Sequence, residues 1–510
     1  MKKLLRILFS RYTVSLLIIL LELGCFVPSF WLAGGEIALA LSTPFSVIAI
    51  VSVINRDANP EFKLTWIIVI TFIPYLGTLI YVLFSRRRLS KREMKMYKSI
   101  LPKISVNDRG ESSASLESLY NESPLAATKA RAILNDDFVA RVCRKTEMKY
   151  YPTGEEMYSD MLGALSKAEH YIFLEYFIIA QGKMWDGIHE LLLQKAKSGV
   201  EVRVLYDDVG SMGTVPNSFA DTLRAEGIRC ERFSPITPSV SAGHNNRDHR
   251  KIMIIDGRVA FTGGINIADE YINEKLRFGH WKDGGIRLMG DAVLPMLELF
   301  LVSWDKSSGK VSDWEGFKAR CEAVKSDGGY YVPFSSGPLP IYRRPTGKNV
   351  FLNVINQAQK SVYITTPYLI IDYDLTESLR NASLRGVDVK IITPAVADKK
   401  LVKVMTKSSY KYLMDAGVGI YEYTPGFIHE KLLLSDGEYS VIGTINFDYR
   451  SLVHHFENAV WSYKSAENKR IEEGFKSTLT LCRKIEHTDA KLNLIEWAVK
   501  IIIRVFAPLL

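Results

Sequence analysis

Cysteine is scarce in this sequence, and its spacing predicts no cross-link. The chain has five cysteines among 510 residues. They are Cys25, Cys143, Cys230, Cys321 and Cys482. A disulfide framework or a zinc site needs paired or closely spaced cysteines, so neither is expected. No other metal site is obvious in the sequence, and we expect neither a metal nor a cofactor.

The chain also lacks an excess of acidic residues. It carries 65 Lys and Arg against 56 Asp and Glu, which gives a formal net charge of +9 and a pI of about 9.0. This balance indicates an anionic partner, either membrane lipid or nucleic acid. Much of the positive charge lies beside the apolar N-terminal segments. We therefore expect anionic membrane lipids as partners and no nucleic acid.

Long apolar runs are concentrated in the first 85 residues. Three segments, Thr13–Leu32, Glu36–Asn55 and Leu64–Phe84, have about the length needed to cross a bilayer. A cleaved signal peptide is the alternative for the first segment, but no good small-residue cleavage site precedes the next apolar run. Basic residues flank the first and third segments, and both flanks therefore favour the cytoplasm. That requires an even number of crossings, so we expect two or three hydrophobic helices, one of the first two being interfacial or re-entrant if there are three.

One short pattern occurs twice, at residues 249–256 and 429–436. Both copies read H-x-K-x-x-x-x-D, as HRKIMIID and HEKLLLSD. They align without a gap at an offset of 180 residues (429 minus 249). The same offset matches Gly257 with Gly437, Gly263 with Gly443, Ile265 with Ile445 and Asn266 with Asn446. Polar residues that recur in register inside apolar strands are hard to explain by packing, so the repeat indicates catalysis.

Each copy predicts a hairpin, because an apolar run is followed by Asp-Gly, a strong turn signal. Residues two apart on a strand share a face, so His249 and Lys251 project together, as do His429 and Lys431. Wider similarities, such as GVEVRVLYD from position 199 and GVDVKIITP from position 386, predict helix, strand, helix and strand before each hairpin. We expect an α/β fold of two tandem α/β/α half-domains with largely parallel sheets. Their face-to-face packing with pseudo-twofold symmetry would bring both His-Lys pairs into one cleft.

Two histidines and two lysines in one cleft suit phosphoryl transfer. The unperturbed pKa of histidine, roughly 6.5, allows one imidazole to attack phosphorus while the other donates a proton to the leaving alkoxide. Two lysines would neutralise the non-bridging phosphoryl oxygens, a task that metals perform in many such enzymes.

These residues resemble the phospholipase D superfamily, which carries this doubled motif followed by a Gly-Gly or Gly-Ser/Thr step and an Asn. The resemblance extends to bacterial cardiolipin synthases. It rests on GTINFDYRS from position 443, on HHFEN around Glu457, on RDHRKI around the first histidine and on the Trp-x-Asp that ends at Asp283. Asp248 departs from the Asn that is common in that family; it is a near-isostere. The likeness covers nearly the whole chain.

The resemblance implies a two-step transfer. One phosphatidylglycerol would load a histidine and release glycerol, and a second would accept the phosphatidyl group to give cardiolipin. We expect His249 to be the nucleophile and His429 the acid/base, although the sequence does not fix that order. The expected catalytic set is His249, Lys251, Asp256, His429, Lys431 and Asp436. Asp256 and Asp436 would orient the site or form the turns.

Four further residues are expected to support this set. Asn266 and Asn446 would add hydrogen bonds to the phosphate or its ligands, and Asp283 and Glu457 would orient the imidazoles. The other histidines, including His244, His280, His454 and His455, are expected at the surface or in supporting positions.

Three other functions remain open at this stage. A phospholipase D-type hydrolase would release phosphatidic acid, since water can attack the same phosphohistidine. A nuclease of the superfamily has no use for three apolar segments. A membrane scaffold with a decayed site predicts the loss of some motif residue, and none is lost. Phosphatidylethanolamine could also replace phosphatidylglycerol as donor.

The expected organisation has five parts. They are an N-terminal membrane region (1–90), a basic or polar linker (91–130), a first phospholipase D-like domain (131–330), a second (331–490) and a C-terminal amphipathic helix (491–510) that is either interfacial or packed on the core. We expect a multi-pass protein of the cell membrane, with the catalytic region on the cytoplasmic side as in the resembling family. The duplication already supplies a twofold site, so no dimer is required.

Overall fold

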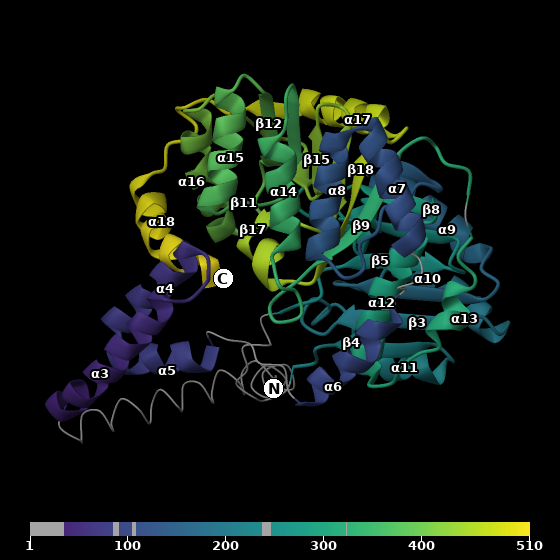
Figure 1. The fold of residues 1–510 in the computed structure, drawn as a ribbon, viewed down its shortest axis with the longest axis horizontal. Helices are drawn as coiled ribbons and strands as arrows, with labels where there is room; N and C mark the ends of the chain where they lie inside the picture. Colours follow the sequence, from purple (N-terminus) through teal and green to yellow (C-terminus); the bar gives the residue numbers. More distant parts are fainter. Residues whose placement is uncertain (1–34, 85–90, 105–108, 237–245, 323, 510) are drawn as a thin grey trace. The chain divides into compact units, whose positions relative to one another are not determined.

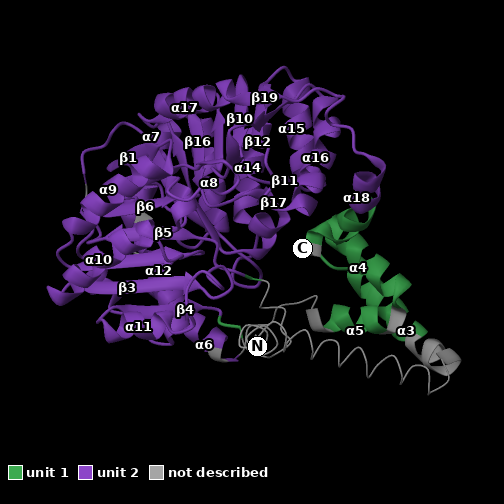
Figure 2. Ribbon diagram, turned by 180° about the vertical axis from the view of Figure 1, so that it is seen from behind, with its two compact units in different colours: residues 1–88, 235–246, 501–510 green, residues 89–234, 247–500 purple. Residues whose placement is uncertain are grey.

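The structure is a computed structural model of the chain. It describes residues 35–84, 91–104, 109–236, 246–322 and 324–509. The chain divides into two compact units (Figure 2). Unit 1 comprises residues 1–88, 235–246 and 501–510, and unit 2 comprises residues 89–234 and 247–500. Both copies of the repeated motif lie in unit 2.

The first half of unit 2 is built on a seven-stranded sheet (Figure 1). In spatial order its strands are β1 (Thr146–Tyr151), β8 (Gly285–Gly290), β6 (Val259–Gly263), β5 (Lys251–Ile255), β2 (Tyr171–Tyr176), β3 (Glu201–Asp207) and β4 (Arg229–Phe233). Strands β2, β3 and β4 are parallel, and β2 is buried along its whole length. Such burial is typical of a parallel strand that is covered on both faces.

The second half repeats this sheet in the same order and adds one edge strand. Its strands are β19 (Cys482–Lys484), β13 (Gly419–Tyr423), β12 (Asp388–Pro394), β10 (Ser361–Thr365), β15 (Leu432–Ser435), β16 (Tyr439–Gly443), β18 (Glu457–Tyr463) and β9 (Tyr330–Ser336). The predicted tandem α/β repeat is therefore confirmed. The prediction of a largely parallel sheet was wrong, since four of the six neighbouring pairs in the first sheet are antiparallel. The reason is that the hairpin strands insert next to β2 with no crossover helix between them.

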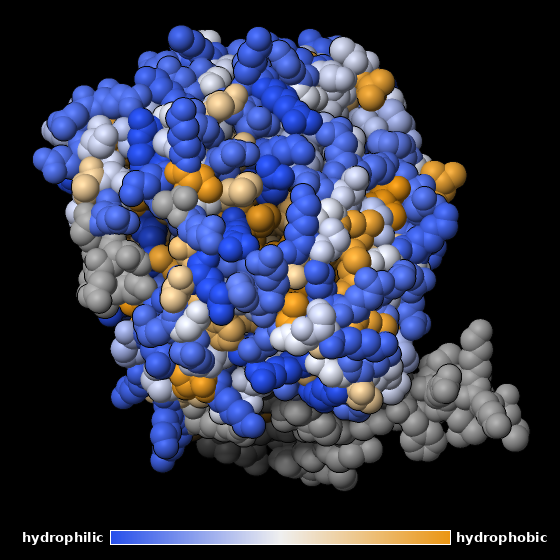
Figure 3. All heavy atoms as spheres, turned by 90° about the vertical axis from the view of Figure 1, so that its right-hand side faces the viewer, coloured by the Kyte–Doolittle hydropathy of each residue, from blue (hydrophilic) through white to orange (hydrophobic). Residues whose placement is uncertain are grey.

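Helices cover the outer face of each sheet, and a shared core lies between the sheets. The first sheet carries α9 (Gly154–Ser166), α10 (Lys183–Lys197) and α11 (Phe219–Ala225), and the second carries α14 (Thr346–Asn356), α15 (Tyr373–Leu384) and α16 (Lys400–Met414). The shared core includes Phe173, Ile254 and Leu434 from both sheets, together with α12 (Val293–Ser308) and α17 (Asn468–Thr480). The side of unit 2 that carries α9, α10 and α13 (Trp314–Lys318) is largely hydrophilic (Figure 3).

Short strands connect segments that are distant in the sequence. Strand β7 (His280–Lys282) of the first half pairs in parallel with β14 (Gly426–Ile428) of the second. Strand β11 (Leu369–Ile370) pairs with β17 (Phe447–Asp448), which is followed by η4 (Arg450–His454); the first half has η3 (Asp269–Ile272) at the comparable place. The β7–β14 pair brings the segment before the second hairpin alongside the first half.

The stretch 91–130, where we expect a basic or polar linker, is largely helical in the structure. It forms α6 (Lys91–Ile100), η1 (Leu101–Lys103), α7 (Arg109–Glu122) and the start of α8 (Pro124–Asp136). Tyr97 and Ile100 are buried in the shared core, and α8 packs on α14. The Ser123 hydroxyl accepts the amide hydrogen of Ala126 and so caps α8. A few apolar residues at helical spacing therefore bind this polar stretch to the core.

In unit 1, one of the predicted apolar segments is divided between two helices. The segment Thr13–Leu32 and the basic flanks at residues 2–11 and 86–88 lie outside the described residues. The second apolar segment forms α3 (Gly35–Ile54). The third is divided between α4 (Pro60–Phe72) and α5 (Pro74–Phe84), because proline has no amide hydrogen to continue a helix. Among the described residues, no helix combines the length and apolar character required to cross a membrane.

The C-terminal helix α18 (Leu494–Phe506) is followed by η5 (Ala507–Leu509). Within unit 1, η5 packs on α4, and the Thr65 hydroxyl donates to the carbonyl oxygen of Val505. Leu494, Ile495 and Ile502 are each more than 60% exposed. The helix therefore has an apolar face that the described residues do not cover.

Candidate active site

The two motif histidines are held by the backbone of the opposite repeat. The amide of His249 donates to the carbonyl oxygen of Phe456 at 2.9 Å, and the amide of His429 donates to that of Lys282 at 2.7 Å. Each histidine precedes the first strand of its hairpin. The matched pairs of hydrogen bonds define two equivalent half-sites, each made of one motif and a segment from the other repeat.

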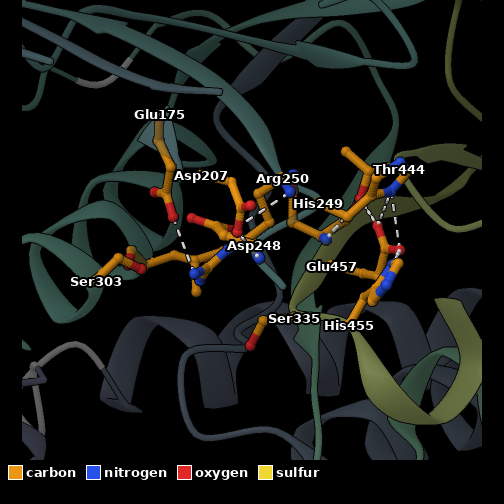
Figure 4. A network of polar contacts seen from close by, with 12 residues as sticks. Glu175, Asp207, Asp248, His249, Arg250, Ser303, Ser335, Thr444, His455 and Glu457 are labelled. Atoms are coloured by element: carbon orange, nitrogen blue, oxygen red, sulfur yellow. Dashed lines mark hydrogen bonds and ion pairs between the residues drawn. The ribbon is translucent and has the colours of Figure 1, made fainter. Parts of the chain in front are cut away.

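Each histidine also meets a carboxylate of the opposite repeat. His249 Nδ1 lies 3.0 Å from Glu457 Oε2, and His429 Nδ1 lies 2.7 Å from Asp283 Oδ2. Both carboxylates are fully buried. Figure 4 shows Glu457 between the side chains of His249, His455 and Thr444. A carboxylate on Nδ1 holds the ring in one orientation and tautomer, which leaves Nε2 for chemistry.

The two motif lysines lie in one buried cluster with the histidines. The ammonium of Lys251 donates to the carbonyl oxygen of His249 at 2.5 Å, and Lys431 donates to that of His429. Burial lowers the pKa of Lys251 to about 7, and the positive charge of Lys431 acts in the same direction. Burial lowers the pKa of Lys431 to about 8. The charge of Lys431 acts on Lys251, which requires the two ammonium groups to lie near each other. Both copies of the motif therefore belong to a single site.

Burial also sets the protonation of the histidines. It lowers the pKa of His249 to about 3 against the opposing charge of Glu457. It lowers the pKa of His429 to about 4, and the charge of Lys431 acts in the same direction. Both imidazoles are therefore neutral near pH 7 before substrate arrives. A bound phosphate would favour the imidazolium form by its negative charge.

The motif aspartates are not in this cluster. Asp256 and Asp436 lie at the turns of the hairpins with φ of 54° and 57°, and Asp256 is roughly 16 Å along the strand from Lys251. The carboxylate of Asp256 accepts the amide hydrogens of residues 169–171, and that of Asp436 accepts those of residues 359–361. Both aspartates fasten a hairpin to the start of β2 or β10. We therefore remove them from the catalytic set.

The two motif asparagines have different surroundings. Asn266 Oδ1 accepts the amide hydrogen of Ile178, and its amide group donates to the hydroxyl of Tyr271, so both ends of the side chain are engaged. Asn446 donates to Asp448 at 3.3 Å, whereas its Oδ1 has no hydrogen-bond partner among the described residues. Of the two, Asn446 keeps the greater capacity to bind a ligand.

A buried ionic network lies behind the first motif (Figure 4). Arg250 points away from its neighbours His249 and Lys251, as strand alternation requires. Its guanidinium lies 2.9 Å from Glu175 Oε1 and 2.7 Å from Asp248 Oδ1. Asp248 thus pairs with the arginine of its own motif, which explains an acid at this position.

His455, which the sequence placed only at the surface or in a supporting position, belongs to the site. Its exposed fraction is 7%, and its ring centre lies 5.5 Å from that of His249. The gapless offset of 180 residues does not align His455 with a residue of the first site. The reason is that Asp283 follows Asn266 by 17 positions, whereas Glu457 follows Asn446 by only 11. Alignment on the two carboxylates would have shown it. His280 is exposed and contacts Tyr423, and His244 lies outside the described residues.

His249, His455 and Glu457 also have donor atoms within 4.8 Å of one another, a spacing that a metal ion could use. Lys251 lies beside them and acts on His249 by its positive charge. A dication at this place would meet that ammonium group. The charge of Lys251 therefore opposes binding of a metal ion by these three side chains.

Comparison with known proteins places this geometry in a family. The model of the cardiolipin synthase, phospholipase D-like domain matches residues 161–276 and 351–479, one match in each repeat. The model of the phospholipase D-nuclease N-terminal region matches residues 45–86. Cardiolipin synthase of Halalkalibacterium halodurans is 33% identical over 94% of this chain and 94% of its own length. The chain belongs to the cardiolipin synthase family.

Two other relatives extend over the same length. Cardiolipin synthase of a Geobacillus species is 32% identical over 98% of this chain and all of its own. An uncharacterised protein of Streptococcus mutans is 39% identical over 91% of this chain and 99% of its own. The crystal structure of phosphatidylserine synthase from Haemophilus influenzae has a TM-score of 0.57 over 75% of this chain and 98% of its own, with 13% identity. That likeness shows the fold of this cardiolipin synthase family member.

Proposed function

We propose that this chain is a phosphatidyltransferase that makes cardiolipin and glycerol from two molecules of phosphatidylglycerol. The observation that carries the proposal is the crossed pairing of His249 with Glu457 and of His429 with Asp283, around two buried lysines. This arrangement provides one imidazole for attack, a second for proton transfer and two cations for the phosphoryl oxygens. Family membership supports the same activity.

In the first step, Nε2 of His249 attacks the phosphorus of the donor lipid. A bond forms between nitrogen and phosphorus, and the bond from phosphorus to the glycerol headgroup breaks. His429, protonated when the phosphate binds, gives its proton to the departing glycerol oxygen. Lys251 and Lys431 balance the charge on the non-bridging oxygens.

In the second step, neutral His429 removes the proton from a headgroup hydroxyl of the acceptor lipid. That oxygen attacks phosphorus, the nitrogen–phosphorus bond breaks, and His249 is regenerated with release of cardiolipin. Water in place of the lipid hydroxyl would give phosphatidic acid. Burial of the catalytic side chains favours the lipid hydroxyl by limiting access of water.

We further propose that residues 1–90 attach the enzyme to the cell membrane, with the catalytic region on the cytoplasmic side. The apolar segments in this range and the match of residues 45–86 to the N-terminal family model support attachment. Residues 131–330 and 331–490 would act as the two phospholipase D-like domains. The net charge of +9 suits an anionic bilayer.

The test is lipid-product analysis in a bacterial host that lacks cardiolipin. The parent chain is compared with His249→Ala and His429→Ala variants expressed to the same level in membranes. Cardiolipin from the parent and none from either variant would support the proposal. Phosphatidic acid as the sole product would identify a hydrolase, and unchanged lipids in all three strains would contradict an enzymatic function.

A further inference from the structure

The two half-sites differ at one equivalent position. Each orienting carboxylate is preceded, two residues earlier, by a ring that packs on the catalytic histidine of its own half-site. On the His249 side this ring is His455, and on the His429 side it is Trp281. Both rings lie 5.5 Å from their histidine, measured between ring centres. The two catalytic histidines therefore occupy chemically unequal surroundings.

His455 is poised beside the carboxylate that orients His249. Neither of its ring nitrogens has a hydrogen-bond partner among the described residues. Its Nδ1 lies 3.8 Å from Glu457 Oε1. Nδ1 of His249 lies 3.0 Å from both carboxylate oxygens and hydrogen-bonds to Oε2, which also accepts from the hydroxyl of Thr444, so Oε1 has no hydrogen bond among the described residues. A movement of about 1 Å would bring His455 to hydrogen-bonding distance of Oε1.

This neighbour disfavours a positive charge on His249. A hydrogen bond from His455 to Glu457 would divide the negative charge of the carboxylate between two imidazoles, and less of it would remain to stabilise an imidazolium at His249. The charge of His455 lowers the pKa of His249 in the same sense. The other charged groups around His455 and Glu457 are Lys251, Lys431, Asp448 and Arg450.

The opposite half-site has no ionisable group at the position of His455. Trp281 has no ionisable group, and its indole ring lies at 45° to the ring of His429. Aromatic rings attract cations through the negative charge of their faces. Tyr271 adds a second aromatic contact, also 5.5 Å from His429 between ring centres. His429 thus has an aromatic ring at both places, whereas His249 has one aromatic neighbour, Phe177 at 5.0 Å between ring centres, and the ionisable His455.

We propose that His455 is a positioning residue that acts through Glu457 to keep His249 in the neutral, attacking form, while Trp281 leaves His429 as the proton donor. The inference rests on the proposed phosphatidyl transfer and deepens it. In this proposal the two matched half-sites have different roles because one has tryptophan at position 281 and the other has histidine at the equivalent position 455.

The test uses a lipid whose leaving group needs no proton. Full-length enzyme in phosphatidylglycerol vesicles is mixed with phosphatidyl-p-nitrophenol between pH 3 and 8, and the burst of released p-nitrophenol is read after quenching into alkali. In the burst, the bond from His249 Nε2 to phosphorus forms and the bond from phosphorus to nitrophenolate breaks. We expect a burst from the parent and from His429→Ala, and none from His249→Ala.

His455→Trp then copies the opposite half-site. We expect the acid limb of its burst profile to move up by about one pH unit, because His249 becomes easier to protonate. His455→Gln, which can still donate a hydrogen bond to Glu457, should show a smaller shift of the acid limb than His455→Trp. Trp281→His, the matched control in the other half-site, should leave the acid limb in place.

The possible failures are distinguishable. Absence of a burst from the parent enzyme would overturn the proposed phosphatidyl transfer itself. A normal burst whose acid limb is the same in the parent, His455→Trp and His455→Gln would overturn the role of His455 alone. Thermal unfolding of each variant identifies one that has not folded, and either substitution at position 455 suffices for the test.

Discussion

Glu457 Oε2 lies 3.0 Å from Nδ1 of His249, although the two residues belong to different repeats of the chain. The reverse pairing joins Asp283 to His429. Each catalytic imidazole thus depends on the opposite repeat for its orientation. Half of the molecule would contain a complete motif but no complete half-site, which explains why both repeats share one core.

Replacement of Glu457 by glutamine is expected to lower kcat by roughly 100-fold or more, the scale of a positioned acid-base group. The amide is close in size, but it cannot supply the negative charge that stabilises His249 as a phosphohistidine. The measurement is transfer of labelled phosphatidyl groups in vesicles. Asp283→Asn should cause a comparable loss through His429. Full activity in either variant would show that the carboxylate charge is not needed.

The motif aspartates are expected to affect stability and not chemistry. Asp256→Ala removes three hydrogen bonds to backbone amides at a site that is 2% exposed, and should lower the free energy of unfolding by about 2–4 kcal/mol. Asp436→Ala should cost less, because Asp436 is half-buried and water can replace it. Denaturant unfolding gives the ranking, and kcat per folded molecule should stay within a few-fold of the parent. A large loss of kcat without loss of stability would return the aspartates to the catalytic set.

The sequence predicted the parts of the site that depend on local pattern. Strand alternation and the Asp-Gly turns were sufficient to predict the hairpins and the shared face of His249 and Lys251. The Asp-Gly signal also predicted Asp256 and Asp436 at the turns, where the structure has them. Their distance from the histidines was not predictable from the motif alone, because a repeated spacing does not tell which end of a strand faces the site. The sequence did not place His455 beside His249, because the loop before Glu457 is shorter than its counterpart and the offset that aligns the histidines misaligns the carboxylates. The third apolar segment is continuous by hydropathy, but Pro74 divides it between α4 and α5.

The lysines predict an alkaline loss of activity. Burial lowers the pKa of Lys251 to about 7 and that of Lys431 to about 8, so both lose their positive charge at a lower pH than an ordinary lysine. Because the cations attract the lipid phosphate, kcat/KM should fall as the pH rises through this range. Lys251→Arg should remove the earlier part of the fall, since a guanidinium stays charged. Initial rates in vesicles from pH 6 to 9 at constant ionic strength would measure it, and a constant kcat/KM up to pH 9 would contradict the prediction.

The ionic network behind the first motif predicts a second effect on stability. Arg250→Met leaves Glu175 and Asp248 buried without their cation, and should lower the free energy of unfolding by about 3–5 kcal/mol. Asp248→Asn is the matched control, because the amide oxygen can still accept from Arg250, and it should cost about 1 kcal/mol. Tryptophan fluorescence during denaturant unfolding would compare them. Equal losses would show that the arginine is not stabilised by this network.

The exposed face of α18 predicts a contact with lipid. Leu494, Ile495 and Ile502 are 79%, 76% and 64% exposed, in contrast to the hydrophilic side of unit 2 in Figure 3. A variant that lacks residues 1–90 isolates this contribution to vesicle binding. In that variant, replacing all three residues by glutamine should weaken binding to anionic vesicles by roughly 100-fold, at about 1 kcal/mol for each apolar side chain. Replacing Lys469 and Glu473 of α17 by glutamine is the control, because this exposed pair has opposite charges and should not change binding. If the apolar substitutions instead lower thermal stability and leave vesicle binding unchanged, the helix packs on protein and does not lie in the lipid interface.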